Sequence, residues 1–191
     1  MGKFFGNLHL VLVVGLVLAI AVMFGYAADI PVTVNTVFRW LHVFFGILWI
    51  GLLYYLNFVQ VPTMPAIPAE QKGAITGHIA PKVFFFFRYA ALLTVITGLV
   101  VAYVAGYVHR ALVLNGSTGA ENLIGLGMWL ALIMAFNVWF IIWPAQKKIL
   151  GIVEASAEAK AAAAPRALAA SRTNLLLSLP MLYCMVSANM G

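Results

Sequence analysis

Residues 36–60 read TVFRWLHVFFGILWIGLLYYLNFVQ and decide the fold class of this chain. Their only charged residue is Arg39, near the first end of the stretch. A helix of about 20 apolar residues spans the hydrocarbon core of a bilayer, so the stretch predicts a transmembrane helix. Four further stretches have the same character, at about residues 8–27, 83–109, 122–149 and 173–190. We expect an all-α, polytopic bundle of five transmembrane helices that forms a single integral membrane domain over residues 1–191.

The composition excludes the other broad classes of protein. Hydrophobic residues make up 64% of the chain and charged residues 8%, and the mean hydropathy is +1.03. A soluble domain carries about 25% charged residues, and disorder requires low hydrophobicity. The single cysteine, Cys184, excludes an intramolecular disulfide, a Cys-ligated iron–sulfur cluster and the attachment motif of a c-type haem. The net charge of +6 favours contact with anionic lipid and no nucleic-acid partner.

Basic residues gather in alternate loops and so predict an orientation. The positive-inside rule places the N-terminus in the cytoplasm and the C-terminus outside. The acidic residues all fall in loops or interfacial segments, which argues against an ion-coupled pump because such proteins use intramembrane carboxylates. Between the fourth and fifth stretches, the Ala-rich residues 151–170 predict a helix that extends one of the two. The basic residues of the cytoplasmic side are Lys3, Lys72, Lys82, Lys147, Lys148, Lys160, Arg166 and Arg172.

One histidine lies well inside a predicted span. His42 follows Thr36 by six residues, which places it roughly 9 Å from the outer end of the second helix. A histidine at this depth is costly unless it pairs or ligates. Two interpretations stay open, a hydrogen bond to a neighbouring helix and a ligand of haem or another metal. Gly46, one turn further along, either leaves room for a flat macrocycle or allows close helix packing.

Other polar residues mark the remaining spans. The third stretch ends in His109, and the small residues that precede it on one face predict close helix contact. His109 and His42 both lie toward the outer leaflet. We expect Arg88 to extend its side chain to the cytoplasmic interface, and Asn137 and Asn174 to hydrogen-bond across helices.

Three blocks of sequence carry a resemblance to a known family. They are RWLH at 39–42 with WIG at 49–51, NVW at 137–139 with IWPAQKK at 142–148, and RTN at 172–174 with SLP at 178–180. Together they resemble the second, fourth and fifth helices of the N-terminal membrane domain of bacterial membrane-bound urate oxidase. The first block is also similar to haem-dependent membrane protoporphyrinogen oxidases and to copper-resistance membrane proteins. The resemblance implies a multi-pass protein of the bacterial inner (cytoplasmic) membrane whose helices hold haem or another metal.

The resemblance also implies a function. It points to a membrane redox protein that binds haem b and exchanges electrons with a c-type cytochrome or a larger membrane complex. His42 is the expected axial ligand, and Arg39 is expected to contact a haem propionate. For the second axial ligand we favour His109 over Met190. Met190 occupies the position at which the family pattern predicts a histidine. Copper is the alternative metal, because a neutral imidazole suits either.

Two alternatives remain at this point. One is a urate-oxidising enzyme with a separate cytochrome acceptor, in which Arg88, Asn137 and Asn174 contact the substrate. The other is a non-catalytic accessory subunit of a respiratory or photosynthetic membrane complex. A visible spectrum separates a haem protein from a colourless subunit, and urate turnover with added cytochrome c identifies the enzyme.

Overall fold

A computed structural model describes residues 2–26 and 32–188 of the chain. Helices make up nearly all of these residues, and no strand occurs among them. The all-α fold class is therefore confirmed. Four helical stretches in the described ranges are long and apolar enough to cross a membrane, at Leu8–Gly25, Val34–Ala66, Ala69–Val104 and Gly119–Ile149.

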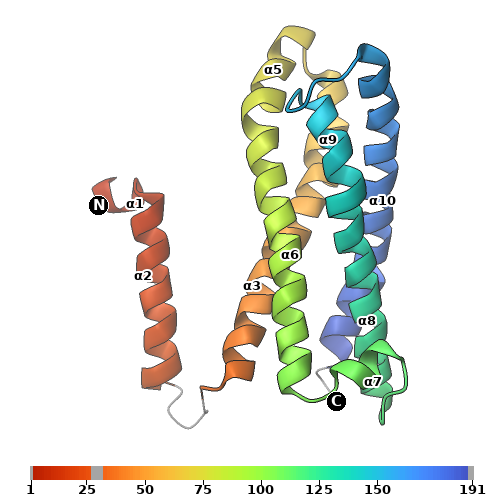
Figure 1. Ribbon diagram of the computed structural model, residues 1–191. Coiled ribbons are helices and arrows are strands. Elements are labelled where there is room, and N and C mark those ends of the chain that lie inside the picture. The colour runs from red at the N-terminus through yellow and green to blue at the C-terminus, as the bar shows by residue number, and fades with distance from the viewer. Residues whose placement is uncertain (1, 27–31, 189–191) are drawn as a thin grey trace.

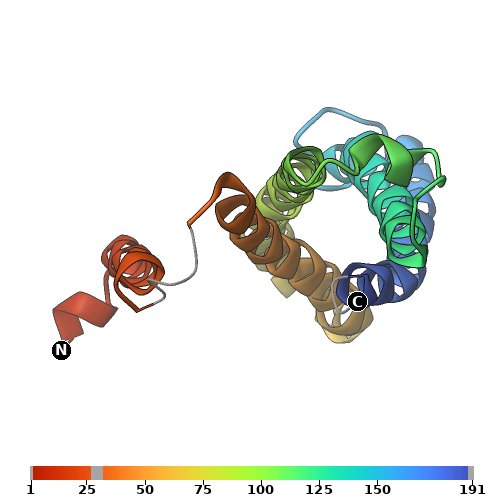
Figure 2. The same ribbon diagram turned by 90° about the horizontal axis from the view of Figure 1, so that it is seen from below.

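The first helical segment stands apart from the rest of the molecule. It consists of α1 (Gly2–Phe5), α2 (Leu8–Ala21) and a π-helical continuation (Val22–Tyr26). The side chain of Asn7 caps α2 by accepting a hydrogen bond from the backbone N–H of Leu10. No residue of α2 is buried, and both views place it away from the other helices (Figures 1 and 2). An apolar helix without protein contacts requires lipid around it.

The other long helices form an antiparallel bundle. α3 (Val34–Tyr55) runs on through a π-helical segment (Leu56–Gln60), and α6 (Ala80–Val104) returns beside it. α8 (Gly119–Phe136), a π-helical segment (Asn137–Ile142) and α9 (Trp143–Ile149) form the next continuous rod. α10 (Ala157–Ser187) completes the bundle. Seen along the axis, the four rods form a ring (Figure 2).

Short elements close the two ends of the bundle. Between α3 and α6, the chain makes five single turns: α4 (Val61–Thr63), 3₁₀ turns at Met64–Ala66 and Ala69–Gln71, α5 (Lys72–Ala74) and a π turn (Ile75–Ile79). At the opposite end, α7 (Val108–Leu112) joins α6 to α8 (Figure 1). The side chains of Thr33, Thr118 and Ser156 cap α3, α8 and α10.

Two helix boundaries differ from the sequence-based expectation. The third helix ends at Val104 and not at 109, because Gly106 adopts a left-handed φ of +77° that turns the chain into α7. The fifth helix begins at Ala157, so the Ala-rich segment extends the fifth helix rather than the fourth. Its apolar part follows the polar residues Arg172, Thr173 and Asn174, and α10 is therefore not among the four most apolar stretches. Five spans remain a prediction.

Small residues let the helices approach closely. The bundle core is formed by large side chains such as Trp49, Leu53, Phe87, Met134 and Val138, all almost completely buried. α10 contributes mainly alanine, serine and asparagine to this interior. At the α8–α10 contact, a Cβ added to Gly127 would lie 2.9 Å from the Cβ of Cys184. In a membrane, such close approach of small residues is a main source of helix association.

Candidate functional site

His42 projects from α3 onto the backbone of α6. Its Nδ1 atom lies 2.8 Å from the carbonyl oxygen of Thr94, and the hydroxyl of Thr97 lies 3.5 Å from the same nitrogen. A carbonyl oxygen accepts hydrogen bonds only, so Nδ1 is the nitrogen that carries the proton. In the neutral imidazole, Nε2 then has a free lone pair. The interhelical hydrogen bond expected for His42 is therefore present, and it leaves the second nitrogen available as a ligand.

The imidazole ring lies directly on Gly98. A Cβ at residue 98 would lie 2.7 Å from Cε1 and 2.9 Å from Nδ1 of His42, but 3.6 Å from Nε2. Nε2 is thus the ring nitrogen that lies farther from Gly98. Gly46 meets only the Cγ2 atom of Thr94, at an ordinary 3.9 Å. The position of the His42 ring therefore requires a glycine at residue 98. Gly46 instead lies at the α3–α6 contact.

The other proposed cofactor residues lie nearer the end of the bundle. Arg39 is exposed on the first turns of α3, where its Nη2 donates to Oδ1 of Asn35 at 3.2 Å. Burial raises the pKa of the Tyr107 phenol in the α6–α7 turn, and the nearby charge of Arg39 lowers it by less. His109 is exposed on α7, beyond the end of α6. Met190 lies outside the described residues.

No cluster of metal-binding side chains occurs in the described part of the chain. Nowhere in residues 2–26 and 32–188 do three or more His, Cys, Asp or Glu side chains come together in a way that could hold a metal ion. His42 supplies a single imidazole with one free nitrogen. That donor set suits the axial side of a haem, whose iron already has four ring nitrogens.

The expected hydrogen bonds between α8 and α10 are present. Nδ2 of Asn137 donates to Oδ1 of Asn174 at 2.9 Å, and Nδ2 of Asn174 donates to the carbonyl oxygen of Met134 at 3.0 Å. Both amides are buried, Asn174 completely. Asn137 is also the first residue of a π-helical segment, a feature often found at functional sites.

A second buried amide faces α10 from the other side of the bundle. Asn57, in the π-helical continuation of α3, donates from Nδ2 to Oγ of Ser171 at 2.9 Å and to the carbonyl of Leu53 at 2.9 Å. Its Oδ1 atom is buried without a hydrogen-bond partner, as is Nε1 of Trp49. Oε1 of Gln60 is a third such atom, so two acceptors and one donor without partners are buried on this rod.

Arg88 holds α6 against α9. Its guanidinium lies 3.5 Å from the ring centroid of Trp143, and Nε donates to the carbonyl oxygen of Phe84 at 3.1 Å. Nε1 of Trp139 donates to the Arg88 carbonyl at 3.2 Å. Phe84 lies one turn nearer the basic end of the bundle, so the side chain extends in the direction expected from the sequence. The stacking on Trp143 was not expected.

The sequence identifies the polar residues but not their partners. The small residues before His109 predict close helix contact, and two of them, Thr94 and Gly98, do contact α3, where their partner is His42. The pairs Asn57–Ser171 and Arg88–Trp143 were missed. Each joins two helices far apart in the chain, and helical periodicity gives only the face of one helix at a time.

Comparison with known proteins identifies one family. The family model described as urate oxidase N-terminal matches residues 90–191, which include Asn137, Asn174 and His109 but not His42. No curated protein and no solved structure matches the chain.

Proposed function

The chain belongs to the urate oxidase N-terminal family, and from this premise we propose that it is a membrane redox protein that binds haem b through His42. In this proposal it exchanges electrons with a c-type cytochrome or a larger membrane complex. The observation that carries the proposal is the hydrogen bonding of the His42 imidazole. His42 has its Nδ1 proton held by the carbonyl of Thr94, which leaves the Nε2 lone pair free, and Nε2 is the ring nitrogen farther from Gly98.

This arrangement is the one that ligating histidines use. A metal-bound imidazole almost always donates its other N–H to a backbone carbonyl or carboxylate, which fixes the tautomer and the orientation of the ring. Thr94 supplies that carbonyl, and Gly98 supplies the flat surface against which the ring is held. The residues present therefore fit one axial position of a haem.

The protein environment sets the properties of such a site. When bound, haem supplies one-electron transfer, with a potential set by axial ligands, burial and hydrogen bonding. Arg39, exposed at the outer end of α3, is placed to pair with a carboxylate near the membrane surface. The apolar α3–α6 contact around His42 keeps the imidazole neutral, because a charged histidine in the bilayer is costly. His109 and Met190 remain the two proposed second ligands, and copper the alternative metal.

One observation favours a second candidate function, the oxidation of urate or a similar small heteroaromatic compound. The buried Oδ1 of Asn57 and Nε1 of Trp49 have no partner among the described residues. A buried donor and acceptor without partners cost free energy unless a ligand or water satisfies them. The carbonyl and N–H groups of such a ring are the kinds of partner that the Trp49 donor and the Asn57 acceptor lack. In this reading Asn137, Asn174 and Arg88 line the route of the substrate.

The visible spectrum of the purified protein tests the first proposal. We expect a Soret band and a sharp α band on reduction, and a pyridine haemochrome typical of haem b. His42→Ala should lose both bands while remaining folded, and His78→Ala, at the opposite end of the bundle, should keep them. A colourless wild-type protein from haem-sufficient cells would overturn the haem proposal and favour an accessory subunit. Urate-dependent reduction of added cytochrome c tests the second.

A further inference from the structure

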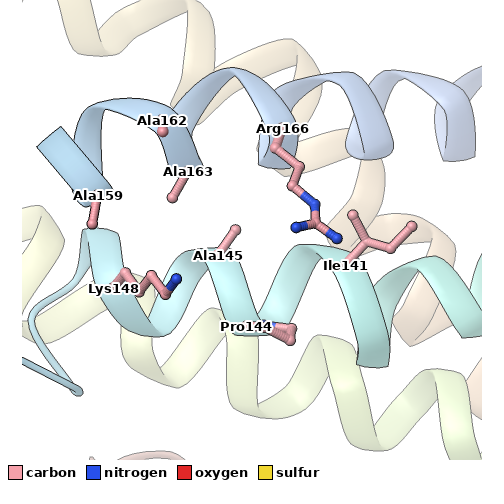
Figure 3. A pocket seen from close by; sticks show the side chains of 8 residues that line it. All are labelled: Ile141, Pro144, Ala145, Lys148, Ala159, Ala162, Ala163 and Arg166. Atoms are coloured by element: carbon pink, nitrogen blue, oxygen red, sulfur yellow. The ribbon is translucent and has the colours of Figure 1, made fainter. Parts of the chain in front are cut away.

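A cavity of about 200 Å³ lies between α9 and the first turns of α10. Figure 3 shows its two walls. Alanines face each other from the two helices, and two basic side chains lie beside them. Arg166 reaches from α10 toward α9, and Lys148 lies along α9 with its ammonium directed toward Ala145. The lining residues are Ile141, Pro144, Ala145, Lys148, Ala159, Ala162, Ala163 and Arg166.

The two cations have no counterion among the residues that the structure describes. No carboxylate lines the cavity, and neither Lys148 nor Arg166 forms an ion pair with any residue in the described ranges. The nearest acidic residue along α10 is Glu158, and its carboxylate is engaged elsewhere. It accepts hydrogen bonds from its own backbone N–H and from the Ser156 hydroxyl, which lowers its pKa. Two like charges facing one hollow repel each other unless an anion lies between them.

The shape of the cavity follows from the small residues. Ala145 on α9 and Ala163 on α10 are buried, so the two helices touch at this point. Ala159 and Ala162 flank the contact without filling the space beside it. The result is a hollow with an alanine floor and cations at its rim. Arginine and lysine are the side chains that bind phosphate groups, through paired N–H donors and point charge respectively.

The location indicates the source of the phosphate. Lys148 lies one turn beyond Trp143, a residue type that gathers at the membrane–water interface. The cavity lies at the end of the bundle with the most basic residues, which the positive-inside rule places at the anionic leaflet. Basic pockets between transmembrane helices on that side bind the headgroups of acidic lipids. We propose that the cavity binds a phosphate group, and that this group belongs to an anionic phospholipid.

The experiment uses the purified full chain in a neutral detergent. Its thermal unfolding is followed while phosphatidylglycerol is added, with phosphatidylcholine as the neutral lipid and inorganic phosphate as the soluble anion. The pocket variant is Lys148→Gln with Arg166→Gln. The matched control is Lys160→Gln with Arg172→Gln, which removes the same charge from exposed positions on α10 outside the cavity. A third variant, Ala162→Leu, keeps every charge but fills the hollow.

We expect phosphatidylglycerol to raise the unfolding temperature of the wild type. The apparent affinity should fall roughly tenfold in the pocket variant and less than about twofold in the control pair. Ala162→Leu should lose the response as well, and Lys148→Arg with Arg166→Lys should keep it. Protection by inorganic phosphate alone, lost in the same variants, keeps the phosphate site and assigns it to a soluble ligand. An equal fall in both charge pairs, or an unchanged response in Ala162→Leu, would overturn the proposal, because either shows attraction to the whole basic surface.

Discussion

The ring of His42 and the backbone of Gly98 are in direct contact, since a Cβ at residue 98 would lie 2.7 Å from Cε1 of the imidazole. No other residue type therefore fits at position 98 unless His42 moves. The contact with Gly98 and the hydrogen bond to the Thr94 carbonyl hold the ring against α6 at two points one turn apart. The position of the candidate ligand thus depends on a residue of another helix.

Gly98→Ala should displace His42 and weaken the α3–α6 contact. We expect a loss of about 1–3 kcal/mol in the free energy of unfolding, the usual cost of an added methyl group in a well-packed site. Haem recovered with the purified variant should fall in parallel. Gly46→Ala is the matched control, because its new Cβ would meet Thr94 Cγ2 at an ordinary 3.9 Å. Equal effects of the two substitutions would show that Gly98 has no particular role in placing His42.

Asn174 connects α10 to α8 through two hydrogen bonds. Asn174→Leu leaves Nδ2 of Asn137 buried without a partner, and it removes the side-chain hydrogen bond to the Met134 carbonyl, which still accepts from the backbone N–H of Asn137. We expect it to lower the free energy of unfolding by about 1–3 kcal/mol, measured by denaturation in mixed micelles. Asn137→Leu should cost less, toward the lower end of about 1–3 kcal/mol, because Oδ1 of Asn174 loses its partner but Nδ2 keeps its bond to Met134. The reverse order would mean that Asn137 is the more important of the two amides.

Arg88→Lys removes a planar group from the face of Trp143. Lysine keeps the charge but neither stacks nor retains the Nε bond to Phe84. We expect a loss of about 1 kcal/mol in stability and a change in tryptophan fluorescence. Lys147→Gln is the control, since its ammonium lies 6.0 Å from the centroid of the same ring. An unchanged spectrum and stability in Arg88→Lys would show that the stacking contributes nothing.

The sequence predicts individual helices better than it predicts their contacts. Hydropathy placed the starts of four long helices within three residues of those of α2, α3, α6 and α8, because lipid contact selects long apolar segments in any fold. The predicted end of the third helix, at residue 109, lies five residues beyond the observed end at Val104. The reason is that the chain becomes helical again in α7, at Val108–Leu112. In the sequence, Gly106 marks the break, because glycine readily adopts the left-handed φ of +77° found there. The helix that accepts the hydrogen bond from Nδ1 of His42 is determined by how the helices pack. A single sequence does not specify that packing.

The orientation of the bundle predicts the result of reporter fusions. A reporter placed after Gly116, between α7 and α8, should lie outside, and one placed after Ile152, between α9 and α10, should lie in the cytoplasm. The physical reason is the excess of lysine and arginine at the α9–α10 end. Alkaline phosphatase and a cytoplasm-active fluorescent protein give opposite readouts at the two sites. The opposite pattern at either site would contradict the predicted topology.

The last prediction concerns the second axial ligand. A low-spin b haem requires a donor on the face opposite His42, and the candidates at the outer end are His109 on α7 and Met190. We expect His109→Met to raise the reduction potential, because a His/Met pair favours the reduced iron relative to a His/His pair. Met190→Leu should leave the spectrum and the potential unchanged. The α7 helix is held in place independently of any cofactor, since Ala111 is buried against Gly125 of α8, so His109→Met should remain folded. A spectral change confined to Met190→Leu would assign the ligand to Met190, and unchanged spectra in both variants would leave His42 as the sole axial donor among these residues.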